Sequence, residues 1–296
     1  MLVALGVTNV ALLVGLYFVA RLADRESEAG DHRAGIRAVW IMLAYPFALA
    51  WTAPLSDGLF LALLALTFWL VRGGRWYWAA AAAFLAGLTR PVAVTLIPLI
   101  AWEFARQHGW LRLPLQTRPS LSDLPKLTTA IVAVGAVPAA TCAYFGYLYV
   151  RFGDFLLPLH TQFGPPWSHQ RLPQWETFTI AIQRLLTVRE TGMLLTQLVF
   201  LVGFAAILVL SARRQPFGYV LYMVGLFYII TAAPVPGAVD LLTGAVRYLA
   251  AAIPVFLVLA EWCVRRPRLE LSLIATGMML QGAFTIAFFA YKGDVP

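Results

Sequence analysis

The sequence predicts an all-α protein, a polytopic transmembrane helical bundle with about ten membrane segments. Three observations predict this class. Apolar residues make up 61% of the 296-residue chain, and its mean hydropathy is +0.77. Only 12% of the residues are charged, whereas a soluble domain carries about 25%. The apolar residues also occur in long runs that short basic clusters separate. Since so few charges could not solvate a fold of this size, we expect lipid to surround the helices.

The apolar runs fall into two length classes, because a helix needs about 20 residues to cross a bilayer. The full-length runs are 2–20, 127–150, 193–212, 247–263 and 270–290. The shorter runs are 38–53, 58–71, 76–89, 91–105 and 217–232. Short helices are tolerated where their ends line a cavity within the membrane. The pattern therefore predicts one transmembrane domain, residues 1–296, with a recessed site.

The basic residues predict the orientation of this bundle. With ten spans, 15 of the 22 Lys and Arg residues lie on one side and 7 on the other. The positive-inside rule makes the richer side cytoplasmic. The net charge of +8 is thus a topology signal. The sequence has no basic stripe interleaved with aromatic residues, so we do not expect it to bind nucleic acid. Cys142 and Cys263 lie inside apolar runs without CxxC spacing, which argues against a disulfide or zinc site.

The longest external segment on this topology is residues 151–192. A loop of this length is usually functional, and the periodicity of 177–188 predicts an amphipathic helix in the membrane interface. Its candidate functional residues are Arg151, Asp154, His160, Gln162, Trp167 and His169. An Arg151–Asp154 pair that only fixes the turn is the favoured alternative on physical grounds, and a loop histidine is more often solvated.

Two charged residues at external helix ends are candidates for chemistry, because ionisable groups near membrane depth are costly. Asp57 could bind a metal, a sugar hydroxyl or a basic partner. The alternative is that Ser56 or Asp57 caps the helix that begins at Gly58. Arg90 precedes Pro91, which should end or kink a helix. Its guanidinium suits a phosphate through two parallel hydrogen bonds, although an arginine can also snorkel to anchor a helix end.

Arg247 begins a later external helix and fits two functions equally well: a second phosphate contact, or an interface anchor. Glu103 and Glu261 lie at the expected cytoplasmic helix ends, where we expect them to snorkel or to be paired. Arg33, Arg37 and the arginines of 265–268 are read as topology signals.

Four segments in order resemble the PIG-V type of mannosyltransferases, polytopic enzymes of the GT-C class. They are 45–66 with PLSDGLF, 74–99 with LTRP, 149–167 with RFGD, and 246–260 with VRYL. The resemblance covers most of the chain and implies a GT-C-like bundle. It also implies transfer of mannose from a polyprenyl or dolichyl phosphate donor to a lipid or glycan acceptor at the non-cytoplasmic face. The eukaryotic members act in glycosylphosphatidylinositol anchor synthesis.

The resemblance also implies roles for the candidate residues. Arg151 and Asp154 would shape the site, and the loop 155–192 would contact the acceptor. Asp57 is the candidate catalytic residue and would assist metal or acceptor binding, while Arg90 and Arg247 would bind the donor phosphate. Whether a divalent metal takes part stays open. The implied partners are membrane lipids, the lipid-linked donor and a glycan or glycolipid acceptor. The expected location is the plasma membrane of a prokaryote or the endoplasmic reticulum of a eukaryote.

The chain departs from the family pattern near its start. The main acidic residue of the family lies in the first external loop, and no acidic loop precedes the first helix of this chain. Asp57 matches the second external acidic position of the family, where the family usually has Glu. We therefore expect Met1 to be an internal or misassigned start, or the chain to be a natural truncation, and we expect residues 1–296 alone to lack transfer. Two alternatives remain: a transporter or flippase for a lipid-linked sugar, which should show paired inverted repeats, and a non-catalytic membrane subunit.

Overall fold

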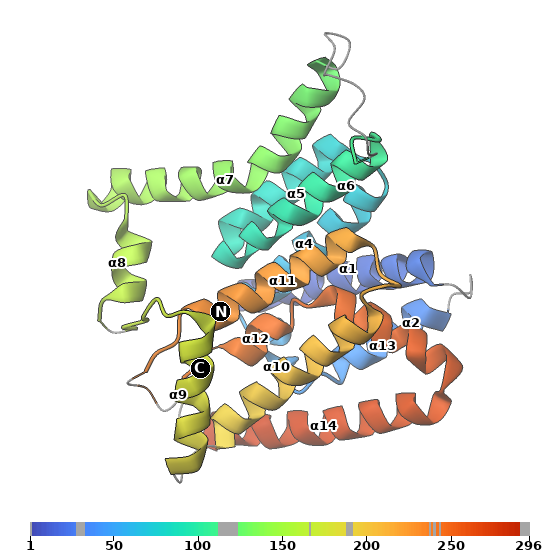
Figure 1. Cartoon of the computed structure of the whole chain (residues 1–296), viewed down its shortest axis with the longest axis vertical. Coiled ribbons are helices and arrows are strands. Elements are labelled where there is room, and N and C mark those ends of the chain that lie inside the picture. The colour runs from blue at the N-terminus through green and yellow to red at the C-terminus, as the bar shows by residue number, and fades with distance from the viewer. Residues whose placement is uncertain are drawn as a thin grey trace.

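A computed structural model describes residues 2–27, 33–111, 124–165, 167–187, 192–236, 238, 241–242 and 244–290. Within these ranges all regular structure is helical, which confirms the predicted all-α class. The helices are α1 Leu2–Glu26, α2 Arg33–Leu43, α3 Leu49–Thr52, α4 Asp57–Arg72, α5 Trp76–Thr89, η1 Pro91–Thr95, α6 Leu96–Gln107, α7 Leu124–Phe152, α8 Leu157–Phe163, α9 Gln174–Thr187, α10 Gly192–Ser211, α11 Phe217–Ala232, α12 Ala245–Leu249, α13 Ile253–Arg265 and α14 Pro267–Ala290. Figure 1 shows their arrangement.

Four of the described helices are long and apolar enough to cross a membrane: α1, α7, α10 and α14, the last over Pro267–Ile286. They match four of the five full-length runs expected from the sequence. Exposed apolar side chains cover much of their surface; Leu2, Val150, Val209 and Met279 are each at least 75% exposed. Such surfaces are unfavourable in water and favourable in lipid, so the fold is compatible with an integral membrane protein.

The expectation that 247–263 forms one full-length span is wrong. The chain breaks between α12 and α13, and Pro254 lies in the first turn of α13, where its missing N–H costs nothing. At 13 residues α13 is about 20 Å long. The residues from Ile253 to Ala260 are all buried. Most of this helix is therefore packed inside the bundle.

The five shorter apolar runs are helical, and two of them are interrupted. The run 38–53 is divided between α2 and α3, and the run 91–105 begins as the 3-10 helix η1 before it becomes α6. Arg90 has an extended backbone, with φ −152° and ψ 136°. Pro91 restricts the residue before it to this region, so it ends α5 as the sequence predicts.

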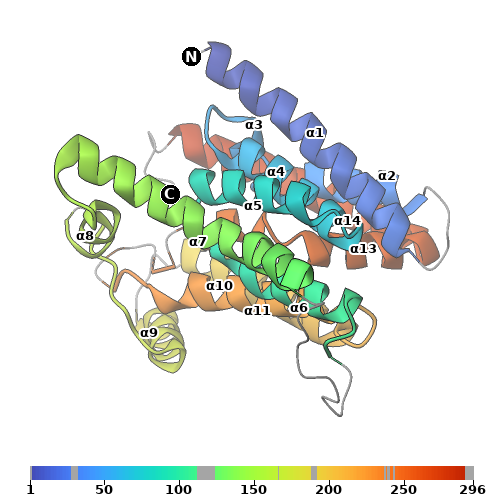
Figure 2. The same cartoon turned by 90° about the horizontal axis from the view of Figure 1, so that it is seen from above.

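Helices α1, α4, α5 and α7 pack side by side in that order, as Figure 2 shows. Small residues permit close approach: a Cβ atom on Gly87 of α5 would lie 2.8 Å from the Cβ of Ala140 in α7. Such small contacts are typical of membrane helix interfaces. Helix α7 bends along its length (Figure 1) and contains Pro138, which accounts for the bend because proline removes a backbone hydrogen bond.

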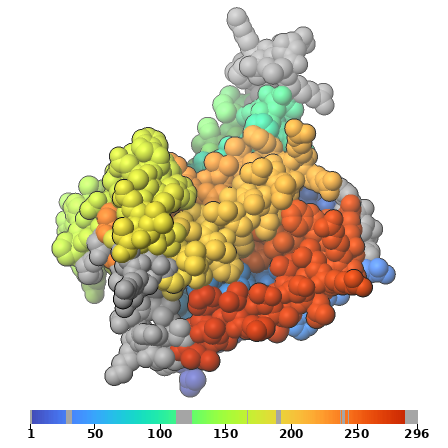
Figure 3. Space-filling model, turned by 60° about the horizontal axis from the view of Figure 1, so that its bottom comes forward, coloured from blue at the N-terminus to red at the C-terminus, as the bar shows by residue number. Residues whose placement is uncertain are grey.

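The bundle has two chemically different ends, which α4 connects over about 24 Å. At the Asp57 end, the Thr8 hydroxyl donates to the carbonyl of Leu55 at 3.2 Å. At the arginine-rich end, Arg25 donates to the carbonyl of Arg72 at 2.8 Å. Helices α8 and α9 lie toward the Asp57 end (Figure 1), and α9 protrudes at the side of the bundle in Figure 3.

Helix α9, Gln174–Thr187, lies where an amphipathic helix is expected at 177–188. Trp175, Phe178, Ile182 and Leu186 are exposed along one stripe, while Thr177 and Ala181 on the other side are buried. The Thr177 hydroxyl donates to the carbonyl of Thr231 at 3.0 Å, which fastens α9 to the end of α11. An exposed apolar stripe on a docked helix is suited to the membrane interface.

Met1 lies outside the described residues, and so do four of the basic residues that were counted for the orientation: Arg112, Arg118, Arg189 and Lys292.

The two ends define a topology prediction. We expect reporter fusions after Trp110 and after Arg266 to label one side of the membrane, and a fusion after Trp167 to label the other. Trp110 follows α6 and Arg266 follows α13, both at the arginine-rich end, while Trp167 follows α8 at the Asp57 end. The measurement is the side of the membrane on which each fused reporter is active. The same side for all three positions would contradict the orientation.

Candidate functional site

Asp57 begins α4 and is only 3% exposed. Ser56 makes no side-chain capping hydrogen bond, so the capping alternative is wrong for that residue. The turn is tightly packed: a Cβ atom on Gly58 would lie 2.7 Å from the Trp51 carbonyl oxygen and 2.8 Å from that of Thr8. Glycine is therefore required beside Asp57, because it lets α4 approach α1 and α3.

Arg90 reaches Asp57 from the junction of α5 and η1. Its Nη1 lies 2.8 Å from Oδ1 of Asp57 and its Nη2 lies 3.1 Å from Oδ2. The Arg90 side chain is 12% exposed, and its guanidinium lies 5.7 Å from the centre of the Tyr248 ring. The Arg90 side chain thus points toward Asp57 and is paired with it.

Arg247 reaches the same carboxylate from α12. Its Nε donates to both carboxylate oxygens at 3.0 Å, and its Nη2 donates to Oδ2 at 2.5 Å. The Arg247 side chain is 29% exposed. The Tyr45 hydroxyl holds the segment by donating to the carbonyl of Val246 at 2.6 Å. We call Asp57, Arg90 and Arg247 the Asp57 cluster.

The Asp57 cluster carries one negative and two positive charges, so it has a net charge of +1. Both carboxylate oxygens already accept hydrogen bonds from guanidinium groups. Each guanidinium has five N–H donors, so donors remain after the Asp57 contacts. In the described part of the chain, no group of three His, Cys, Asp or Glu side chains could hold a metal. The arrangement is chemically suited to an anion rather than to a cation.

The expected Arg151–Asp154 pair is wrong. Asp154 instead accepts from Nδ1 of His160 at 2.7 Å and from the Leu156 amide at 2.9 Å. Gly153 has a φ of +73°, a left-handed conformation that glycine adopts without strain. This turn ends α7 and directs Asp154 forward to α8, away from the preceding turn that carries Arg151.

The hydrogen bond from His160 holds the pKa of Asp154 below its ordinary value, and the Leu156 amide acts in the same direction. A carboxyl with a lowered pKa contributes stability above its unfolded pKa of about 3.9, and loses it as the pH falls through the folded pKa. We expect the Leu156 amide to keep its hydrogen-exchange protection from neutral pH down to about 4 and to lose it below. Asp154→Asn should remove this acid transition. Loss of protection already near pH 6 would contradict control by the carboxyl group.

Of the remaining loop candidates, His169 holds the loop against the end of α11. Nδ1 of His169 contacts the carbonyl oxygen of Ala233 at 2.6 Å, and the His169 amide donates to the carbonyl of Gln162 at 3.0 Å. Trp167 is 49% exposed. Within the described residues, no hydrogen bond or ion pair connects these three or Arg151 to the Asp57 cluster. The structure therefore brings together three of the nine candidates, and pairs Asp154 with His160 separately.

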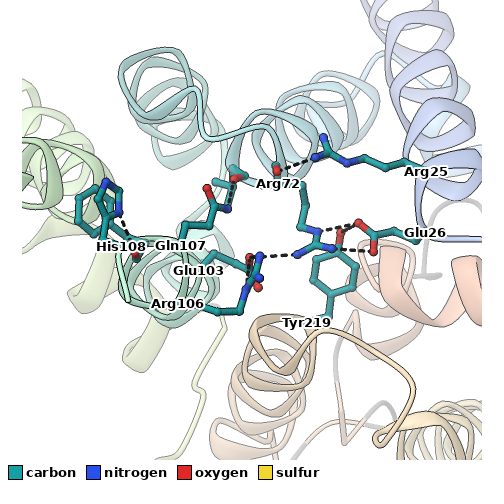
Figure 4. A network of polar contacts seen from close by, with 10 residues as sticks. Arg25, Glu26, Arg72, Glu103, Arg106, Gln107, His108 and Tyr219 are labelled. Carbon is teal, nitrogen blue, oxygen red and sulfur yellow. Dashed lines mark hydrogen bonds and ion pairs between the residues drawn. The ribbon is translucent and has the colours of Figure 1, made fainter. Parts of the chain in front are cut away.

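A second polar network at the arginine-rich end is larger than the sequence suggested (Figure 4). Arg72 contacts Glu26 at 2.6 Å and Glu103 at 3.1 Å, and Arg106 contacts Glu103 at 2.7 Å. Tyr219 donates to Glu26 at 3.2 Å. Glu103 is fully buried, so the pairing alternative for this residue is confirmed and snorkelling is wrong. The position of Glu103 within an apolar run is the feature of the sequence that could have indicated this network, because a buried charge needs a partner.

The fold and the Asp57 cluster define a class: a helical protein compatible with the membrane, with a buried cationic site at one end. Comparison with protein-family models, with curated proteins and with solved structures gives no match to the chain. The function is therefore argued from the site.

Proposed function

We propose that the chain is the body of a GT-C-type membrane glycosyltransferase, in which the Asp57 cluster binds the phosphate of a lipid-linked sugar donor. The convergence of Asp57, Arg90 and Arg247 on one buried point carries this proposal. The three residues come from segments up to 190 residues apart, and each belongs to one of the segments that resemble the PIG-V type. The donor is a polyprenyl or dolichyl phosphate mannose, and the acceptor is a lipid or glycan hydroxyl.

The electrostatics assign different roles to the three residues. Two guanidinium groups stabilise a phosphate diester in the donor and the additional charge of the leaving phosphate. Asp57 holds both arginines in place and offsets one of their charges, so it acts as a positioning residue. In the structure its carboxylate accepts hydrogen bonds from both arginines. For Asp57 to assist an acceptor or metal, donor binding would have to draw the arginines away from it.

The short apolar helices support the membrane part of the proposal. Besides the four long helices, α5 and α11 are apolar but shorter, and α4, α5 and η1 all have ends near the Asp57 cluster. Short helices around a polar site are tolerated where protein or a water-filled cavity surrounds them. In the proposed arrangement, about ten membrane segments surround a recessed site, and the exposed stripe of α9 rests on the outer interface beside it.

Donor binding provides the direct test. We expect the purified chain in detergent to retain radiolabelled polyprenyl phosphate mannose saturably, and polyprenyl phosphate to compete for the site. Free polyprenol, which lacks the phosphate, should not compete. Equal competition by the alcohol and the phosphate would contradict a phosphate site, because the lipid tail alone would then account for binding.

A second measurement separates an enzyme from the two alternatives. Asp57 is engaged by two arginines, and this observation favours a donor-binding, non-catalytic subunit as the second candidate function. In sealed vesicles that contain the chain and an acceptor glycolipid, an enzyme moves labelled mannose from the donor to the acceptor. A subunit binds the donor without transfer, and a flippase moves the intact donor across the bilayer.

A further inference from the structure

A cavity of about 610 Å³ lies at the arginine-rich end, far from the Asp57 cluster along α4. It is bordered by the end of α1, the end of α10, the start of α11 and the end of α13. Its charged lining consists of Glu26, Glu261, Arg214, Arg265 and Arg266. Apolar side chains on α10 and α13, including Leu210 and Leu257, line the part next to the membrane helices.

The charges in this cavity do not cancel. Glu26 is already paired with Arg72 at 2.6 Å, and Glu261 lies 3.4 Å from Arg265. Arg214 and Arg266 are exposed and make no ion pair with the described residues. Two guanidinium groups thus remain, at the level where α10 and α13 end, and this composition favours an anion.

The polar groups beside the arginines are hydrogen-bond acceptors. The carboxylate of Glu261 accepts from the Ser27 hydroxyl at 2.6 Å and retains further lone pairs. Nε2 of Gln215 donates to Ser211 at 2.7 Å. Its Oε1, which is buried, has no hydrogen-bond donor among the described residues. Such an acceptor is costly unless a donor reaches it, and a ligand hydroxyl would supply one.

From these groups we infer that the cavity binds the headgroup of an anionic phospholipid that carries hydroxyl groups, such as phosphatidylglycerol. Arg214 and Arg266 hold the phosphate, Gln215 and Glu261 accept the hydroxyl groups, and the apolar wall contacts the start of an acyl chain. A lipid rather than a soluble phosphate is the occupant because the lining joins apolar side chains of α10 and α13 to the arginines at the ends of these helices, and lipid headgroups lie at the ends of membrane helices.

The test uses the purified full chain in detergent, with thermal unfolding and native mass spectrometry. We expect phosphatidylglycerol to raise the unfolding temperature and to remain bound, and phosphatidylcholine to do neither. The double variant Arg214→Gln/Arg266→Gln should weaken phosphatidylglycerol binding by roughly tenfold or more, because each arginine adds to attraction for an anionic headgroup. The control Arg213→Gln/Arg268→Gln removes the same charge from exposed neighbours outside the cavity lining and should change binding little.

Two results would overturn the inference. Equal weakening by both double variants would show that net charge alone attracts the lipid. Stabilisation by glycerol 3-phosphate as strong as by phosphatidylglycerol would assign the cavity to a soluble ligand. Donor binding at the Asp57 cluster is measured separately with polyprenyl phosphate mannose, so either site can fail without the other.

Discussion

Replacing Asp57 by alanine should destabilise the folded protein by about 3 kcal/mol, the lower end of the range for a broken buried ion pair, because it leaves two partly buried guanidinium groups without a counter-charge. Asp57 is 3% exposed and accepts from both Arg90 and Arg247. The measurement is thermal or denaturant unfolding of the purified chain in one detergent. Asp154→Ala is the matched control, since it removes a carboxylate that is 34% exposed and paired with the exposed His160; exposed ion pairs contribute little.

A double-mutant cycle makes the first prediction specific. If Asp57 acts by offsetting the arginines, then Arg247→Ala should cost much less in the Asp57→Ala background than alone. Additive losses would show that the two residues stabilise the fold independently. A loss from Asp57→Ala no larger than that from Asp154→Ala would contradict a buried, charge-balanced cluster.

The second large effect concerns donor binding. Arg90→Lys should weaken binding of polyprenyl phosphate mannose by about tenfold to a hundredfold, equivalent to one or two charged hydrogen bonds. Lysine keeps the charge but cannot reproduce the planar fork of the guanidinium. Lysine can still pair with Asp57, so the folded protein should survive. The measurement is the dissociation constant for the donor at equal amounts of monodisperse protein.

Arg33→Lys is the control for this measurement, because Arg33 begins α2 at the arginine-rich end and is exposed. It should leave donor binding within about twofold of the parent, as expected for a surface change. If Arg90→Lys and Arg33→Lys were equally silent, the phosphate role of Arg90 would be lost. If both weakened binding equally, general damage to the bundle would explain the result.

Local sequence patterns predicted a large part of the fold. The length of an apolar run determined α1, α7, α10 and α14, and the restriction that Pro91 places on Arg90 ended α5 at the predicted point. These features depend on residues within a few positions of one another. The break within 247–263 was not predicted, because a run of apolar residues is equally consistent with one long helix and with two short buried ones.

The sequence by itself determined which residue types could carry chemistry: a carboxylate at Asp57 and guanidinium groups at Arg90 and Arg247, each at the end of an apolar run where a charge is costly. Only the tertiary structure decided that they meet. The Asp57–Arg90 and Asp57–Arg247 contacts span 33 and 190 residues, and the spacing along the chain carries no information about such distances. The same applies to Arg72, Glu26 and Glu103, which pair across three helices. A buried charge must find a partner of opposite sign, but which partner it finds depends on how the helices pack.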